Sequence, residues 1–164
     1  MIILKRNDEI EKMRESGRFV AQVLDTVGEM VKPGISTWDL EEIADKMVTK
    51  AKVKAAFKNY RVGRHVFPCC LCISVNEEVV HGIPSKKRIL EEGDIVSVDF
   101  GVQKNGYFGD SARTFPVGKI DDTAADLLKV TKEALDKGIE QMYATRRLQD
   151  IGAAIQQHVE SFKF

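Results

Sequence analysis

The chain has 164 residues, of which 43% are hydrophobic and 30% are charged, and its formal net charge is zero. This length is enough for a substantial core, and the balanced charge argues against nucleic acid or an anionic membrane as the main partner. No apolar run reaches the length of a secretory or transmembrane segment, so we expect a cytoplasmic protein that binds neither nucleic acid nor membrane.

Hydrophobic periodicity divides the chain into two helices, a group of strands and two further helices. In chain order, the expected elements are helices at 7–31 and 40–51, strands at 70–75, 79–81, 93–102 and 107–115, and helices at 123–143 and 148–162. The helix at 123–143 is expected to bury Leu135 and Ile139. This order, with hairpin connections between strands, predicts an α+β fold in which helices cover one face of an antiparallel sheet.

The strands at 93–102 and 107–115 are the most informative segment, because they carry Asp99 and Asp110 on opposite arms. Asn105-Gly106 between runs of β-branched and aromatic residues is a strong hairpin signal. A two-residue turn there places Asp99 opposite Ala112, with Asp110 as its diagonal neighbour; a four-residue loop places Asp99 opposite Asp110. Because strand side chains alternate between faces, either register puts both carboxylates on one face, with Cβ atoms roughly 4.5–8 Å apart.

Two carboxylates this close repel each other, so the fold needs a compensating group. A shared proton would make an acid/base dyad in which one pKa is strongly raised. Arg113 is the nearest arginine on that arm, but alternation points it away from the face of Asp110. A divalent cation fits the spacing best. The alternative is that water solvates both aspartates on an exposed face.

The three cysteines, Cys69, Cys70 and Cys72, fall within four residues. An odd and bunched set is not a disulfide framework, and a zinc site would need a second, distant pair of ligands. We expect buried thiols in a strand, which is compatible with a thiol that lines a pocket.

Three segments resemble the bacterial type I methionine aminopeptidases: Ser74–Pro84 (SVNEEVVHGIP), Gly93–Asp99 (GDIVSVD) and Gly109-Asp110. The resemblance covers nearly the whole chain, and the combined spacing of its histidine and two aspartates is specific. It implies the N-terminal half of a pita-bread (creatinase/aminopeptidase) fold, as a single domain over 1–164 that is incomplete at its C-terminus. It also implies metal-dependent removal of the N-terminal methionine of nascent proteins, with a metal-bound water attacking the first peptide bond.

The resemblance also implies residue roles. Asp99 and Asp110 would bind two divalent metal ions (Co, Mn, Fe or Zn), with Asp110 bridging them. His81, Cys72 and Phe67 would bind the substrate, an N-terminal methionyl peptide. The family's remaining ligands, a histidine and two glutamates, lie in a C-terminal half, as does its acid/base carboxylate, so no catalytic residue is expected in this chain.

Two aspartates cannot complete a site that takes about four ligands. We therefore expect low activity, together with an uncovered sheet edge that favours self-association. The segment 59–67 also looks longer and more basic than the family's pocket loop. One competing hypothesis is a non-enzymatic binding module or inactive fragment that keeps half of the fold as a scaffold. Another is a metal-free carboxylate dyad, which would keep its activity in chelator.

Overall fold

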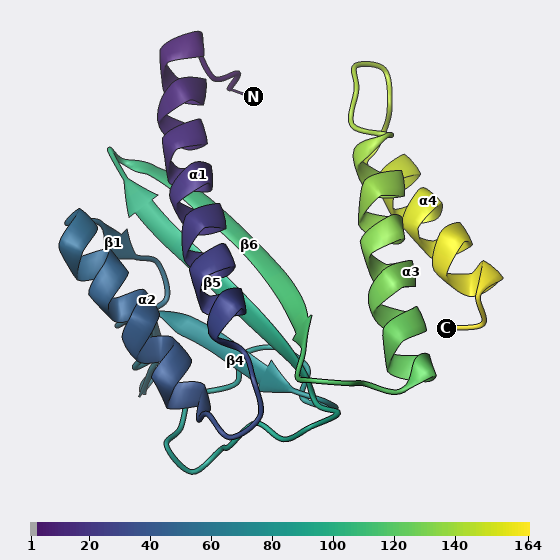
Figure 1. The fold of residues 1–164 in the computed structure, drawn as a ribbon. Helices are drawn as coiled ribbons and strands as arrows, with labels where there is room; N and C mark the ends of the chain where they lie inside the picture. The colour runs from purple at the N-terminus through teal and green to yellow at the C-terminus, as the bar shows by residue number, and fades with distance from the viewer. Residues whose placement is uncertain (1–2) are drawn as a thin grey trace. The chain divides into compact units, whose positions relative to one another are not determined.

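The computed structural model describes residues 3–164, which divide between Lys119 and Ile120 into two compact units (Figure 1). In chain order, the elements are α1 (Asn7–Met30), α2 (Thr37–Ala51), β1 (Lys54–Ala55), β2 (Arg61–Val62), β3 (His65–Val66), β4 (Leu71–Val75), β5 (Ile95–Lys104), β6 (Tyr107–Pro116), α3 (Asp122–Ile139) and α4 (Leu148–Ser161). None of the helices within 3–164 has the length and apolar character needed to span a membrane. A single domain over 1–164 stays a prediction.

Strand β5 is the centre of a four-stranded antiparallel sheet. β6 pairs with its whole length, while β4 and β1 follow one another along its other edge. β2 and β3 form a separate two-stranded ribbon within the basic segment. The predicted hairpin and the strand at 70–75 are therefore confirmed. The predicted strand at 79–81 is wrong, because these residues form a loop whose backbone turns left-handed at Val80 and His81.

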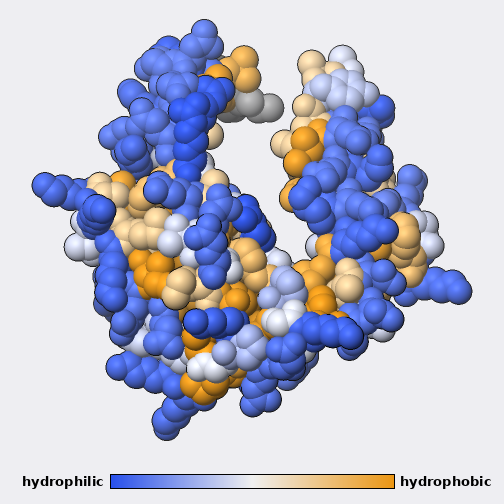
Figure 2. Space-filling view, in the orientation of Figure 1, coloured by the Kyte–Doolittle hydropathy of each residue, from blue (hydrophilic) through white to orange (hydrophobic). Residues whose placement is uncertain are grey.

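The helices α1 and α2 cover one face of this sheet, as predicted, and α1 lies across β5 and β6 in Figure 1. Alternate residues of β5 point into the core, and four residues of α1 at helical spacing meet them. These eight side chains are at most 1% exposed: Val20, Val23, Leu24, Val27, Val96, Val98, Phe100 and Val102. The outer side of α1 is mostly hydrophilic (Figure 2). Full burial of each such side chain contributes about 1.5–3 kcal/mol, so this face supplies much of the stability of the first unit.

A close approach between α1 and β6 fixes the hairpin on the helix. A Cβ at Gly109 would lie 2.7 Å from the backbone nitrogen of Gly17, so only glycine allows this contact. Beside it, the hydroxyl of Ser16 donates to the backbone oxygen of Tyr107 at 2.9 Å. These two contacts with α1 fix the position of β6, the strand that carries Asp110.

The second unit is the antiparallel pair α3 and α4. Val130, Ala134 and Gly138 form its buried stripe, and Ile155 of α4 packs on Gly138. The predicted burial of Leu135 and Ile139 is wrong, because these side chains are 55% and 54% exposed. Apolar surface is visible on this pair in Figure 2. Periodicity identifies apolar stripes correctly, but it does not say which stripe finds a partner.

Candidate metal and substrate site

The hairpin brings Asp99 and Asp110 together on the sheet face that α1 and α2 leave open. Asp99 lies opposite Ala112, and Asp110 lies opposite Gly101. The turn is therefore the two-residue one at Asn105-Gly106, where both residues have positive φ, and the four-residue alternative is wrong. The two aspartates are diagonal neighbours on one face, which places their side chains within reach of a common ligand.

Within residues 3–164, no cationic group lies at hydrogen-bond distance from either carboxylate of this pair. Partial burial and the neighbouring Asp110 carboxylate raise the pKa of Asp99 to about 6, while the nearby His81 acts weakly in the opposite direction. Arg113 does not neutralise the pair, since its guanidinium donates to Asp25 at 2.6 Å. This agrees with the alternation that points Arg113 to the other face. Bringing a cation to this position would relieve the repulsion.

A pocket of about 590 Å³ opens beside the pair. Four of the side chains predicted from the sequence line it, namely Phe67, Cys72, His81 and Asp99, and Asp110 lies on the adjoining strand face. Most of the remaining lining is apolar or aromatic, including side chains from the segment 56–66. The structure therefore brings the predicted residues to one place, whereas their individual roles stay predictions.

Four further side chains with aromatic rings line this pocket and were not predicted from the sequence: Phe57, Tyr60, His65 and Phe108. Tyr60 accepts the backbone N–H of Phe67 at its carbonyl oxygen, at 2.9 Å, which extends the β2–β3 ribbon towards the pocket. The basic segment is thus a hairpin, and its second strand, β3, lines the cavity together with Tyr60. The one sequence signal for it is Gly63, which lies between two short runs that each contain a valine.

Cys72 contributes a neutral thiol to the pocket wall. It pairs directly with Asp99 across β4 and β5 and is 5% exposed. Burial, together with the negative charges of Asp99 and Asp110, raises the pKa of the Cys72 thiol to about 12. It therefore behaves as a small polarizable apolar group and not as a nucleophile.

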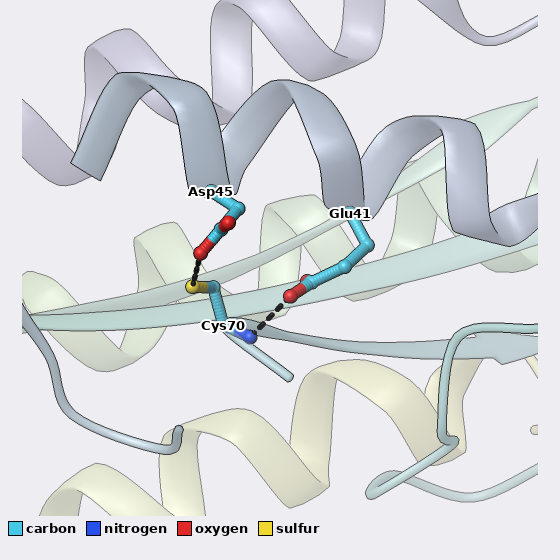
Figure 3. A group of neighbouring side chains, drawn as sticks. All are labelled: Glu41, Asp45 and Cys70. Atoms are coloured by element: carbon cyan, nitrogen blue, oxygen red, sulfur yellow. Dashed lines mark hydrogen bonds between the residues drawn. The ribbon is translucent and has the colours of Figure 1, made fainter. Parts of the chain in front are cut away.

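A second cluster, shown in Figure 3, also has the composition of a metal site. In the described part of the chain, Glu41, Asp45 and Cys70 form the one group of three such side chains whose ligand atoms lie within 4.8 Å of one another. However, the two carboxylate oxygens of Glu41 accept the backbone N–H groups of Cys70 and Leu71, at 2.6 and 2.9 Å. Asp45 accepts from the thiol of Cys70 and from Lys58. These atoms already have partners, so the cluster fixes the start of β4 on α2 and fits a metal poorly.

The aspartate pair fits a divalent cation better on three observations. Its side chains share one face, neither carboxylate has a basic partner at hydrogen-bond distance among residues 3–164, and burial together with the Asp110 carboxylate raises the pKa of Asp99. Carboxylate oxygens suit Mn, Fe, Co and Zn. Two carboxylates do not fill a coordination sphere, so the fit is that of a partial site.

Comparisons with known proteins agree with this chemistry. Residues 11–164 match the profile of "Metallopeptidase family M24". The methionine aminopeptidase of Clostridium acetobutylicum is 48% identical over 164 residues, covering 100% of this chain and 64% of that protein. Methionine aminopeptidase 1 of Bacillus subtilis is 46% identical with the same coverage. The crystal structure of methionine aminopeptidase from Rickettsia prowazekii matches with a TM-score of 0.93 at 36% identity, over 99% of this chain and 63% of that one.

More distant structures share the fold alone. The X-Pro aminopeptidase from Thermotoga maritima matches with a TM-score of 0.79 at 15% identity. The resemblance to methionine aminopeptidases and the predicted N-terminal part of a pita-bread fold are both confirmed. The chain spans about 64% of the length of these curated relatives.

Proposed function

Because the chain belongs to metallopeptidase family M24, we propose that it takes part in metal-dependent removal of the N-terminal methionine from nascent proteins. The observation that carries this proposal is the convergence of Asp99 and Asp110 beside a largely apolar pocket of about 590 Å³. An unbranched methionine side chain suits such a pocket, and a carboxylate pair suits a divalent metal.

In this proposal Asp99 and Asp110 would hold two divalent ions. When bound, such ions polarise the scissile carbonyl and lower the pKa of a coordinated water towards about 7. The chain spans 64% of the length of its curated relatives, and we propose that the remaining ligands come from outside these 164 residues. The 164-residue chain alone is then poorly active.

The other pocket residues act on the peptide. Phe67, Cys72 and neighbouring aromatic side chains surround the methionine side chain and exclude water from it. His81 reaches the pocket from the loop after β4 and contacts the peptide near the scissile bond. The negative charge at Asp99 and Asp110 favours a cationic group at this end of the pocket.

A metal-dependence assay tests the proposal. The purified chain is incubated with MnCl₂ or CoCl₂ and the peptide Met-Ala-Ser, and free methionine is measured against time. We expect slow release that chelator abolishes and that Asp110→Asn abolishes equally, with Glu29→Gln on the exposed side of α1 as the matched control. Release that persists in chelator would favour the metal-free dyad. Release at the full rate of a complete enzyme, or tight one-to-one or two-to-one metal binding by these 164 residues alone in calorimetry, would contradict the partial site.

Two further properties belong to the proposal. Within residues 3–164, β6 pairs with β5 alone, and we propose that its other edge supports self-association, which light scattering coupled to size exclusion would detect. We place the reaction in the cytoplasm, which the three free and buried cysteines support, because oxidising compartments favour disulfides.

A further inference from the structure

A buried serine lies next to the pocket on the same sheet face as the aspartates. Ser74 pairs with Ser97, two positions along the ladder from the pair Cys72 and Asp99, so all four side chains share one face. Ser74 is 3% exposed although it is polar. A buried hydroxyl needs a hydrogen-bond partner, and that partner comes from the loop that carries His81.

The loop rests directly on β4 at Gly82. The backbone N–H of Gly82 donates to the Ser74 hydroxyl oxygen at 3.2 Å, and the backbone N–H of Ile73 donates to the Gly82 carbonyl at 2.9 Å. A Cβ at Gly82 would lie 2.0 Å from the Ile73 carbonyl oxygen, so any other residue would push the loop off the strand. Two hydrogen bonds to β4, and a close approach that only glycine allows, therefore fix the position of Gly82, the residue immediately after His81.

The backbone before this contact is strained. Val80 and His81 both adopt left-handed conformations, with φ of 47° and 57°. This conformation is a clear outlier for a β-branched residue such as valine, and it persists only where surrounding contacts impose it. The contacts that impose it here are those of Gly82 on Ile73 and Ser74.

The far end of the loop has its own anchor on α2. The backbone N–H of Ser85 donates to the Thr37 hydroxyl oxygen at 2.9 Å, and that hydroxyl donates to the Ser85 carbonyl at 3.2 Å. His81 thus lies on a short segment held at one end by β4 and at the other by α2. Of the two anchors, the one at Ser74 is adjacent to His81 and shares the face of the aspartates.

We propose that Ser74 is a positioning residue: its hydroxyl holds Gly82 on β4 and so keeps the strained Val80–His81 segment, and the His81 imidazole, at the pocket. The proposal rests on the proposed function for the role of His81, but the geometry it describes exists without metal or substrate. Loss of the Ser74 hydroxyl should release the strain at Val80 and His81 and let the imidazole leave the pocket.

The test compares Ser74→Ala with Ser16→Ala in the full chain. Ser16 is a matched control, because its buried hydroxyl also bonds to a backbone group, but on the opposite side of the sheet. Backbone ¹³C shifts report the left-handed state of Val80 and His81 without metal. We expect Ser74→Ala to lose these shifts and Ser16→Ala and Ser74→Thr to keep them. Unchanged left-handed shifts in Ser74→Ala would overturn the proposal.

A second measurement separates positioning from general stability. Mn²⁺ is added to chain labelled at its histidines, and broadening of the His81 ring signal is followed. We expect broadening in the wild type and in Ser16→Ala, and its loss in Ser74→Ala while signals around Asp99 still broaden. Where cleavage of Met-Ala-Ser is measurable, kcat should fall by about 10- to 100-fold with little change in KM.

The two failures are distinguishable. Absence of Mn²⁺ broadening anywhere in the wild type counts against the proposed metal site, while the metal-free shifts still decide the role of Ser74. Equal broadening of the His81 ring signal in Ser74→Ala and in the wild type contradicts the positioning role of Ser74 and leaves the proposed metal site uncontradicted. If Ser74→Ala does not fold, the same measurement is made on Gly82→Ala. Left-handed shifts at Val80 and His81 that survive this change would refute the proposal that the contact of Gly82 with β4 imposes them.

Discussion

Replacing Asp99 by asparagine should stabilise the metal-free chain at neutral pH while removing its affinity for metal. The change removes the unfavourable free energy of keeping the Asp99 carboxylate ionised, because that carboxylate is partly buried and close to Asp110. Asparagine keeps the shape of the side chain and carries no charge. The substitution therefore tests whether the pair is electrostatically strained in the way the structure indicates.

The magnitude follows from the raised pKa. Asp99 moves from 3.8 to about 6 on folding. At about 1.4 kcal/mol for each pKa unit, the whole shift would correspond to about 3 kcal/mol. Asp99 is only partly buried, and solvent screening reduces this figure, so we expect a gain of about 1–2 kcal/mol for Asp99→Asn.

The direction of the Asp99 pKa shift determines how the free energy of unfolding depends on pH. A raised pKa means that the folded chain binds this proton more tightly than the unfolded chain does. The resulting stability is fully present below pH 3.8 and is lost as the pH rises through about 6. Carboxylates with lowered pKa, such as Asp45 beside Lys58, act in the opposite direction, but both variants share them. The difference between Asp99→Asn and the wild type should thus be near zero at about pH 4 and reach its full value above about pH 7.

Urea unfolding in chelator measures this difference, with fluorescence of Trp38 as the probe of the first unit. Trp38 is the one tryptophan of the chain and lies in α2. Glu29→Gln controls for the loss of an exposed carboxylate on α1. Adding Mn²⁺ should stabilise the wild type by mass action and leave Asp99→Asn unchanged. Destabilisation by Asp99→Asn at neutral pH in chelator, or a difference that does not vary with pH, would refute the reasoning.

Three further outcomes are expected. Glu41→Gln should destabilise the chain by about 1–3 kcal/mol in urea unfolding, since an amide has one acceptor oxygen for the two backbone N–H groups that Glu41 binds. Gly109→Ala should cost about 1–3 kcal/mol because its Cβ meets the backbone of α1, whereas Gly152→Ala, which has open space inside α4, should stabilise its helix by about 0.5–1 kcal/mol. The three buried thiols between residues 69 and 72 should react slowly with iodoacetamide at neutral pH and quickly in denaturant, because burial raises their pKa.

The aspartate hairpin was predictable because its determinants are local. Asn105-Gly106 predicts a hairpin, and alternation assigns Asp99 and Asp110 to one face in either of the two possible registers. The placement of Asp99 and Asp110 required no knowledge of the rest of the fold. The choice between two registers was the single point that needed the structure.

The loop of His81 and the role of Glu41 were not predictable, because contacts distant in sequence decide both. Valines at 79 and 80 favour a strand by local preference, yet the hydrogen-bonded contact of Gly82 with Ile73 forces a left-handed backbone before it. Glu41 looks like a solvated charge on an amphipathic helix, but it is 3% exposed and binds backbone groups about thirty residues further along the chain. Neither partner leaves a local pattern.

The two faces of the sheet contribute to the stability of the chain with opposite signs. The face covered by α1 and α2 is dry, apolar and fully packed. The other face holds a carboxylate pair that repels itself and a loop with two strained residues, Val80 and His81, and both features lower the stability of the chain. The repulsion between Asp99 and Asp110 can persist in a fold where a bound cation relieves it, whereas backbone strain persists where surrounding contacts impose it. If so, metal should act mainly on Asp99 and Asp110, and the strain at His81 should remain, because Ser74 and Gly82 impose it independently of any ligand.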